Sequence, residues 1–516
     1  MLKFLRKLSI ALLCTLLLLL VGCTLPVPAG EGSATSSSEH KSATATHHIS
    51  FMVFGDPAEK AAYEALVTAF HDVHPAIAVE LQHIPGQSDY RKRLGADFAA
   101  GTPANIVLIN YRRYAPFAAK GVLEPIGPYL DQSDKIKVED FYEQAIAPYR
   151  WDGTLMCIPQ NLSSLVVYYN RDLFEKAGVP LPSNDWTWDE FLAAAQAITQ
   201  DTDGDGITDI YGIGTDATIF RVAPFVWANG GDLVDDPTNP TKLTLDAPAT
   251  KEALQWFIDL QVKHQVAPGL IEEQAEASEN RFLNGRLGMF LNSRRGVPTY
   301  RTIENFTWDV APLPVGPVTR AGILHADAFC MAKTTEDKGA AWTFIEYANS
   351  VEGQTILAAS GRTVPSLKAV AESPVFLQPD LPPANNKGAF IDTIPYIRAV
   401  PVMETWVDIE VTVSEELGAP STAIPRWMRR LTLRSCARVS FGDKQLDVEL
   451  RIYECPQRIG GFLCYFVSYD CIEPPHIHLA KGRNRTAPSV KFWLEPISLD
   501  RNRGLNANEL RQVEKL

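Results

Sequence analysis

Hydrophobic and polar positions change their period several times along the first third of this chain. A short apolar run at 49–54 ends at a glycine, and apolar residues then recur at helical spacing over 58–73, behind an Asp-Pro helix start. Residues 77–81 alternate as a half-buried strand does, and 105–109 form a continuously apolar strand, followed by a helix that ends near 120. This alternation of strands and helices predicts an α/β fold with a mostly parallel sheet covered on both faces.

A second α/β pattern begins after residue 153. Residues 165–169 predict a strand, and Thr187 with Glu190 forms a capping box that opens a helix. Two separate α/β patterns in one chain predict two lobes with a cleft between them. Ligands of such sheets bind beyond the carboxyl ends of the strands, so the residues that follow the first and third strands are expected to belong to a site. They are Phe54, Gly55, Asp56, Asn110, Tyr111 and Arg112.

The composition narrows the class of protein. The chain has 516 residues, of which 46% are hydrophobic, enough to fill two or three cores rather than one. Its formal net charge of -13 argues against nucleic acid as a partner, because phosphate backbones are bound by basic surfaces. The sequence contains no nucleophile elbow, phosphate-binding glycine loop or zinc-protease helix. We therefore predict no catalytic constellation, and an enzyme stays the rival hypothesis to a binding protein. The protein is expected to be a monomer.

The first residues have the pattern of an export signal. Three basic residues precede an apolar stretch at 8–21, which is too short to span a membrane comfortably. The stretch ends on a small residue followed by Cys23, and this resembles a bacterial lipobox. The resemblance implies that 1–22 is a lipoprotein signal peptide and that Cys23 is diacylated, and two acyl chains suffice for stable anchoring. Residues 23–47 are rich in Ser, Thr, Ala and Gly, which predicts a flexible tether.

This N-terminal pattern fixes the expected location of the mature protein. We expect it outside the cytoplasm, in the periplasm or at the cell surface, and lipid-anchored to the membrane. The alternative is an ordinary exported chain in which Cys23 is accidental.

The remaining cysteines are unevenly distributed. Cys157 and Cys330 are interpreted as standing alone. Four more lie between 436 and 471, where an exported chain could use them for disulfides whose pairing the sequence leaves open.

Several motifs between about 48 and 417 occur in the order known from one family. They are YYNRDLFEKAGVP at 168–180, WTWDEF at 186–191, WANGGD at 227–232, FLNGRLGM at 282–289 and GRTVP at 361–365. The chain closely resembles the family 1 extracellular solute-binding proteins of ABC sugar importers, the maltose-binding-like group.

This resemblance implies a periplasmic-binding-protein type II fold, in which two α/β lobes are joined by hinge crossovers. The two-lobed domain would span 48–425, with a first lobe at about 48–155, a second at about 156–295, and a later segment returning to each. The resemblance further implies that a sugar or oligosaccharide is captured between the lobes, unaltered, and delivered to the transmembrane subunits of an ABC permease.

Sugars present apolar C–H faces and a rim of hydroxyl groups, so their sites combine flat aromatic rings with polar side chains. Trp227 beside an Asn-Gly-Gly turn offers both, and the resemblance places Trp406 at an aromatic sugar contact; the alternative is that such rings are core. His325 and Asp327 fall in a segment that returns to the cleft in relatives. The predicted ligand-binding residues are Phe54, Asp56, Asn110, Tyr111, Arg112, Trp227, Asn229, Gly230, Asn292, Arg294, His325, Asp327 and Trp406.

Arginines leave the ligand class open. Arg112, Arg294 and Arg295 stand where related sugar binders carry polar or aromatic cleft residues, and arginine pairs bidentately with carboxylate or phosphate. An acidic sugar or a phosphorylated polyol is therefore the alternative ligand class. Equally, the three arginines could be solvated surface residues.

An acidic loop at 201–209 resembles the start of a calcium loop, with Asp201, Asp203, Asp205 and Asp209 as candidate ligands. Position twelve of that pattern requires a bidentate glutamate, but Gly212 stands there. The loop predicts either a weak structural Ca²⁺ site or a plain turn, and no other cofactor is expected.

The C-terminal end does not continue the family pattern. After a basic linker at 426–453, the segment 454–516 carries PPHIH at 474–478 and FWLEP at 492–496. It resembles a small bacterial domain-of-unknown-function family, which implies a small α+β domain, truncated at its last helix, and brings no activity with it. His476 and His478 would face one side of a strand, as a metal pair or as surface histidines. A gene fusion or a joined reading frame is our hypothesis for this arrangement.

Overall fold

The computed structural model describes residues 46–216 and 218–418, together with strands between 437 and 502. The predicted signal peptide, Cys23 and nearly all of the tether lie outside the described residues. Within the described part of the chain, no helix is both long and apolar enough to cross a membrane.

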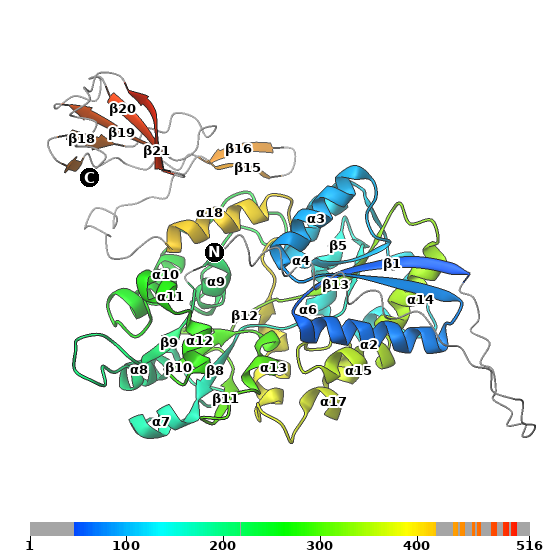
Figure 1. Ribbon diagram of the computed structural model, residues 1–516, viewed down its shortest axis with the longest axis horizontal. Helices are drawn as coiled ribbons and strands as arrows, with labels where there is room; N and C mark the ends of the chain where they lie inside the picture. Colours follow the sequence, from blue (N-terminus) through cyan, green and yellow to red (C-terminus); the bar gives the residue numbers. More distant parts are fainter. Residues whose placement is uncertain are drawn as a thin grey trace, which may run out of the picture. The chain divides into compact units, whose positions relative to one another are not determined.

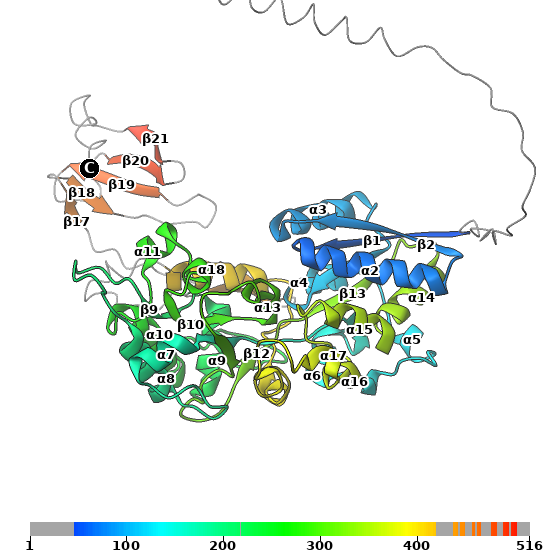
Figure 2. The same ribbon diagram turned by 60° about the horizontal axis from the view of Figure 1, so that its bottom comes forward.

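The first sheet is built largely from the N-terminal pattern. Its strands, in spatial order, are β2 (Ile77–Ile84), β1 (His47–Phe54), β3 (Ile106–Asn110), β13 (Asp327–Ala332) and β4 (Leu123–Glu124), with β7 (Cys157–Pro159) also pairing with β13. Strand β1 runs parallel to β2 and β3, whereas β13 returns antiparallel to β3. Helices α2 (Pro57–Val73) and α3 (Gln87–Ala100) lie on opposite sides of β1 (Figures 1 and 2). The predicted β-α-β-α-β order is confirmed, and β7 joins this sheet just beyond the predicted boundary at 155.

Both sheets are mixed, so the expectation of a mostly parallel sheet was wrong: in the first, β13 is antiparallel to β3, β4 and β7, and the second is mixed as well. Its order is β11 (Trp308–Ala311), β8 (Val166–Asn170), β10 (Leu287–Asn292) and β9 (Tyr211–Gly214). Strand β8 is antiparallel to both of its neighbours, and β10 is parallel to β9. The predicted capping box is present at α8 (Trp188–Ile198), where the Glu190 backbone N–H donates to Thr187 Oγ1 over 3.3 Å.

Further helices complete the two lobes. They are α4 (Tyr111–Ala119), α7 (Arg171–Ala177), α9 (Ile219–Ala228), α10 (Pro248–Val262), α12 (Ser278–Leu283), α14 (Lys338–Ala348), α15 (Val351–Ala359) and α18 (Trp406–Gly418).

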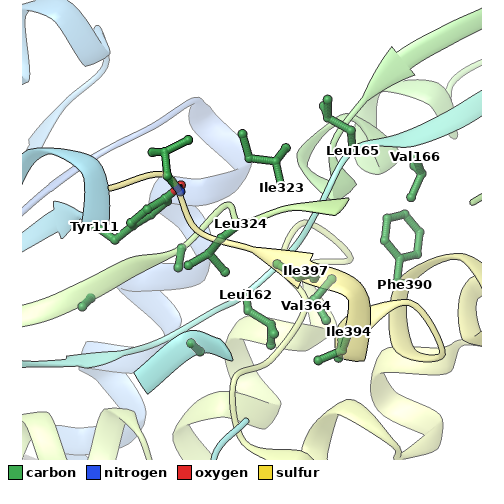
Figure 3. Close-up of a cluster of buried hydrophobic side chains, with 14 of the residues drawn as sticks. Tyr111, Leu162, Leu165, Val166, Ile323, Leu324, Val364, Phe390, Ile394 and Ile397 are labelled. Atoms are coloured by element: carbon green, nitrogen blue, oxygen red, sulfur yellow. The ribbon is translucent and has the colours of Figure 1, made fainter. Parts of the chain in front are cut away.

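Three crossing segments join the lobes, as the two-lobed fold requires. The chain leaves the first sheet after β7, returns from the second through β12 (Gly322–Ile323), and passes again through β14 (Ile397–Arg398), which pairs with β12. Ser163 and His325 exchange backbone hydrogen bonds of 2.8 and 2.9 Å between two of these segments. Apolar side chains from the crossings pack together, among them Leu162, Leu165, Ile323, Leu324 and Ile397 (Figure 3). The predicted hinge crossovers therefore form a packed core of their own.

Cys157 and Cys330 form a disulfide, so their interpretation as lone cysteines was wrong. They are 173 residues apart in sequence and face each other where β7 pairs with β13. Both are fully buried. Sequence spacing could not show this pairing, because it depends on the return of β13 to the first sheet.

The strands after residue 436 form separate antiparallel groups. A pair, β15 (Ala437–Phe441) and β16 (Lys444–Val448), falls within the predicted linker. A five-stranded antiparallel sheet follows, in the order β17 (Gln457–Ile459), β18 (Phe462–Tyr465), β19 (His476–Lys481), β20 (Ser489–Leu494) and β21 (Ile497–Asn502). His476 and His478 stand two positions apart on β19, which places them on a strand as predicted. The expected helix from 506 lies outside the described residues.

Candidate binding site

A cavity of about 790 Å³ lies where the strand ends of both lobes meet the crossing segments. Strands β1, β3 and β10 each contribute the last residue of the strand and residues that follow it. The cavity therefore occupies the place that parallel strand ends favour. Eight of the predicted ligand-binding residues line it: Phe54, Asp56, Asn110, Arg112, Asn292, Arg294, His325 and Asp327.

The other predicted residues do not line this cavity. Trp227 is only 3% exposed, and its indole N–H donates to Asp232 Oδ1 over 3.0 Å. The Asn229 amide donates to the Ala249 carbonyl over 2.9 Å, and a Cβ on Gly230 would meet Val318 at 3.2 Å. Trp227, Asn229 and Gly230 thus all make contacts with other residues of the second lobe.

The physical reason lies in the direction of helix α9. Thr218 and Arg221, at its N-terminal end, line the cavity, whereas Trp227 lies at its C-terminal end. A helix rises about 1.5 Å per residue, so Thr218 and Trp227 are separated by roughly 14 Å along the helix axis. The predicted residue Trp227 therefore lies on a helix that reaches the cavity, but at the end that points away from it.

Replacing Trp227 by phenylalanine is expected to lower stability and to leave ligand affinity unchanged. The variant loses the hydrogen bond to Asp232 and the contact with the Arg398 guanidinium, which lies 4.8 Å from the ring centroid. We expect the free energy of unfolding to fall by about 2 kcal/mol, measured by urea denaturation. Phe220→Leu, which alters a cavity wall, is the matched comparison and should change affinity instead. A loss of affinity in Trp227→Phe would instead support the original prediction that the Trp227 ring contacts the ligand.

Tyr111 and Trp406 are buried beside the crossings rather than in the cavity wall. Tyr111 is fully buried, and its hydroxyl accepts the Val400 backbone N–H over 3.3 Å; Figure 3 shows it next to the apolar hinge cluster. Trp406 is fully buried at the start of α18. Glu410 and Ser414, one and two turns further along the same helix face, do line the cavity.

A buried ion-pair group at the start of α2 was missed. Arg362 is 5% exposed and pairs with Asp56 and, over 2.9 Å, with Glu59. Asp56 also caps α2, because its Oδ1 accepts the Glu59 backbone N–H over 3.0 Å. Glu59 packs on Gly55, where any Cβ would collide with its side chain. Burial, only partly offset by Arg362, raises the pKa of Glu59 to about 7.

Arg112, on α4, is held by Glu410 of the neighbouring helix α18, and both residues line the cavity. Its Nη1 lies 2.5 Å from Glu410 Oε1, and its guanidinium carbon lies 3.9 Å from the centroid of the Phe220 ring. His325 stacks on the same ring at a centroid separation of 4.7 Å. No sequence signal pointed to Phe220 or Glu410, because α9 and α18 meet only in the folded chain.

Arg294 faces the cavity but is fixed by the protein itself. It is almost completely buried, its Nε donates to the Gly361 carbonyl over 2.8 Å, and its Nη1 donates to Asn386. Its guanidinium carbon also lies 4.7 Å from the Phe376 ring centroid. Burial lowers its pKa to about 9. These contacts make Arg294 a structural arginine rather than one of three equivalent ligand contacts.

Asp327 connects the crossing segment to the strand ends. Its Oδ1 accepts the Asn110 side-chain amide over 3.1 Å, and its backbone N–H donates to Asn161 Oδ1 over 3.0 Å. Burial raises the pKa of Asp327, and the hydrogen bond from Asn110 acts against that shift. The cavity thus offers carboxylate and amide groups suited to ligand hydroxyls.

The acidic loop brings together three of its four predicted calcium ligands. Carboxylate oxygens of Asp201, Asp203 and Asp209 lie within 4.8 Å of one another. Asp205 instead accepts the Ile207 backbone N–H over 2.7 Å. Oxygen ligands suit Ca²⁺, so the residues fit a partial site, and calcium stays a prediction. A calcium-dependent rise in the unfolding temperature that Asp203→Asn abolishes would establish it.

Comparisons with known proteins agree with this architecture. Residues 55–355 match the model of the bacterial extracellular solute-binding protein family, and residues 461–516 match that of a domain of unknown function, DUF4160. A binding protein of Brucella abortus (strain 2308) is 26% identical over 361 residues, covering 67% of this chain and 81% of that protein. The chain belongs to the bacterial extracellular solute-binding proteins.

Two further similarities extend the comparison. The sn-glycerol-3-phosphate-binding periplasmic protein UgpB of Agrobacterium fabrum is 28% identical over 221 residues, covering 40% of this chain and 48% of that protein. The solved structure of the ABC substrate-binding protein Lmo0181 from Listeria monocytogenes, in complex with cycloalternan, has a TM-score of 0.65 at 24% identity. The similarity covers 72% of this chain and 93% of the Listeria protein, and it supports the two-lobed fold.

Proposed function

We propose that this protein is the extracytoplasmic receptor of an ABC importer, which holds a carbohydrate or a related polyol between its lobes and delivers it to the transmembrane permease. The cavity of about 790 Å³ is the observation that carries this proposal, because its walls come from both lobes and from the crossings between them. Closure or opening at the hinge would change the cavity directly. The sn-glycerol-3-phosphate-binding relative and the neighbour solved in complex with cycloalternan support a polyhydroxylated ligand.

The location is part of the same proposal. A fully buried disulfide suits a chain that folds in an oxidising compartment, and this supports export. Anchoring through a diacylated Cys23 remains a prediction, since that residue lies outside the described part of the chain. Substitution Cys23→Ala should move the protein from the membrane fraction to the soluble fraction, and retention of the variant in membranes would contradict the lipid anchor.

Ligand-dependent stability tests the receptor hypothesis. A ligand present at a hundredfold excess over its dissociation constant raises the free energy of unfolding by about 2.7 kcal/mol. We expect at least one mono-, di- or oligosaccharide or polyol to give such a shift in thermal unfolding. The bound compound should be recovered chemically unchanged after release. Recovery of a converted product would instead favour the rival hypothesis of an enzyme that shares the fold.

A further inference from the structure

The arginines of the cavity differ in whether the protein already satisfies them. Arg112 is paired with Glu410, and Arg362 with carboxylates at the start of α2. Arg294 donates to a carbonyl and an amide, and its Nη2 alone has no hydrogen-bond partner among the described residues. Each of these three therefore has a structural partner before any ligand enters.

Arg221 and Arg295 are the two cavity arginines that remain. Arg221 Nη1 is shut off from solvent and has no hydrogen-bond partner among the described residues. Its one ion pair among the described residues is a loose one with the exposed carboxylate of Asp216, whose Oδ2 lies 3.8 Å from Nε, beyond hydrogen-bond range. Arg295 is exposed at the cavity wall, and within the described residues its guanidinium makes neither a hydrogen bond nor an ion pair.

Arg221 and Arg295 line the same cavity as His325, and both are close enough to act on the protonation of its ring. Burial holds the pKa of His325 well below the ordinary value, and the nearby guanidinium groups of Arg221, Arg112 and Arg295 act in the same direction. The ring is therefore neutral, and its Nε2 is a buried polar atom without a partner in the described part of the chain. A neutral imidazole can carry its proton on Nε2 and donate it to an acceptor.

Clustered like charges and unpaired buried donors both cost free energy, and one acceptor of negative charge would relieve both. Arginine is well suited to this task, because its planar fork pairs bidentately with carboxylate or phosphate oxygens. Helix α9 is ten residues long, and its N-cap residue Thr218 lines the same wall of the cavity. A helix N-terminus carries partial positive charge, which also favours an anion there.

We propose that the solute carries an anionic group, a carboxylate or a phosphate monoester, which binds Arg221, Arg295 and Nε2 of His325. This inference rests on the receptor function proposed above and specifies its ligand as an anionic polyol. The hydroxyl groups of the same ligand would then face Asp327 and Asn110, which offer oxygen acceptors and an amide on the adjoining wall.

Matched pairs of ligands test the anionic subsite. The full-length protein, purified in detergent and dialysed, is titrated calorimetrically with glucose against glucuronate and glucose 6-phosphate, with glycerol against glycerol 3-phosphate, and with inorganic phosphate alone. We expect at least one anionic compound to bind at least tenfold more tightly than its neutral counterpart. The carboxylate and phosphate members distinguish the two sources of the charge.

Single substitutions assign the contacts. Arg221→Gln and Arg295→Gln should each weaken binding of the anionic compound at least tenfold and reduce its salt dependence, whereas Arg93→Gln, on exposed α3, should leave affinity unchanged. Arg295 has no structural bond to lose, so its variant keeps the test valid if Arg221→Gln fails to fold.

Two outcomes would overturn the inference, and they are distinguishable. Tight binding of a neutral sugar that Arg295→Gln does not weaken would refute the anionic subsite and leave the receptor function standing. No binding by any neutral or anionic compound of the panel would count against the anionic ligand and the polyol receptor together.

Discussion

Replacing Cys157 and Cys330 together by alanine should lower the free energy of unfolding by about 5 kcal/mol, because the disulfide closes a loop of 173 residues in the unfolded chain. The loop-entropy model gives its largest effects for such long loops. Both sulfur atoms are buried, so alanine also leaves small cavities in the first sheet.

Urea unfolding of three samples measures this effect: the wild type, the wild type with reductant, and the double variant. Reductant should bring the wild type most of the way to the midpoint of the variant, which also carries the small cavities, and should leave the variant itself unchanged. The last comparison separates this disulfide from the cysteines between 436 and 471. Coincident midpoints for the untreated wild type and the variant would show that the pair contributes nothing to stability.

Glu59→Gln should change the pH dependence of stability. The pKa of Glu59 rises from 4.5 to about 7 on folding, through burial first, with Arg362 and Arg295 acting against the shift and Asp327 adding to it. The folded state therefore binds this proton more tightly than the unfolded state. Stability is highest below pH 4.5 for this group and falls as pH rises toward 7, by about 3 kcal/mol in total.

Glutamine cannot lose the proton, so the variant should gain on the wild type as pH rises. We expect the difference in unfolding free energy between Glu59→Gln and the wild type to grow from pH 5 to about pH 7 and to level off by pH 8, measured in urea at constant ionic strength. Glu64→Gln, on the exposed side of the same helix, removes a carboxylate without touching the buried pair. A constant difference across this range would contradict the buried, proton-binding role of Glu59.

Elements that have a local signal in the sequence were predicted correctly. The first strands and helices were predictable because each has its own apolar period, and the capping box at Thr187 marks a helix start without help from the rest of the chain. The general position of sites at strand ends then led to Phe54, Asp56, Asn110 and Arg112. The mixed order of the second sheet had no comparable local signal.

Long-range relationships account for what the sequence did not show. Glu410 reaches Arg112 across 298 positions, and Arg362 reaches Asp56 across 306. The end of α9 that faces the cavity depends on how the helix is seated in the second lobe, so Trp227 was chosen where Arg221 lines the wall. Trp227 and Trp406 were expected to contact ligand, but both side chains are buried in the core.

Helix α18 sets a limit on how far this chain can be shortened. Through Glu410 it holds Arg112 of the first lobe, and through the Ser414 hydroxyl it accepts the Ile219 backbone N–H of the second, over 3.2 Å. A cut before the helix would strip Arg112 of its counter-ion and open one side of the cavity to water. Any shorter version made for crystallisation or as a biosensor therefore has to end beyond Gly418.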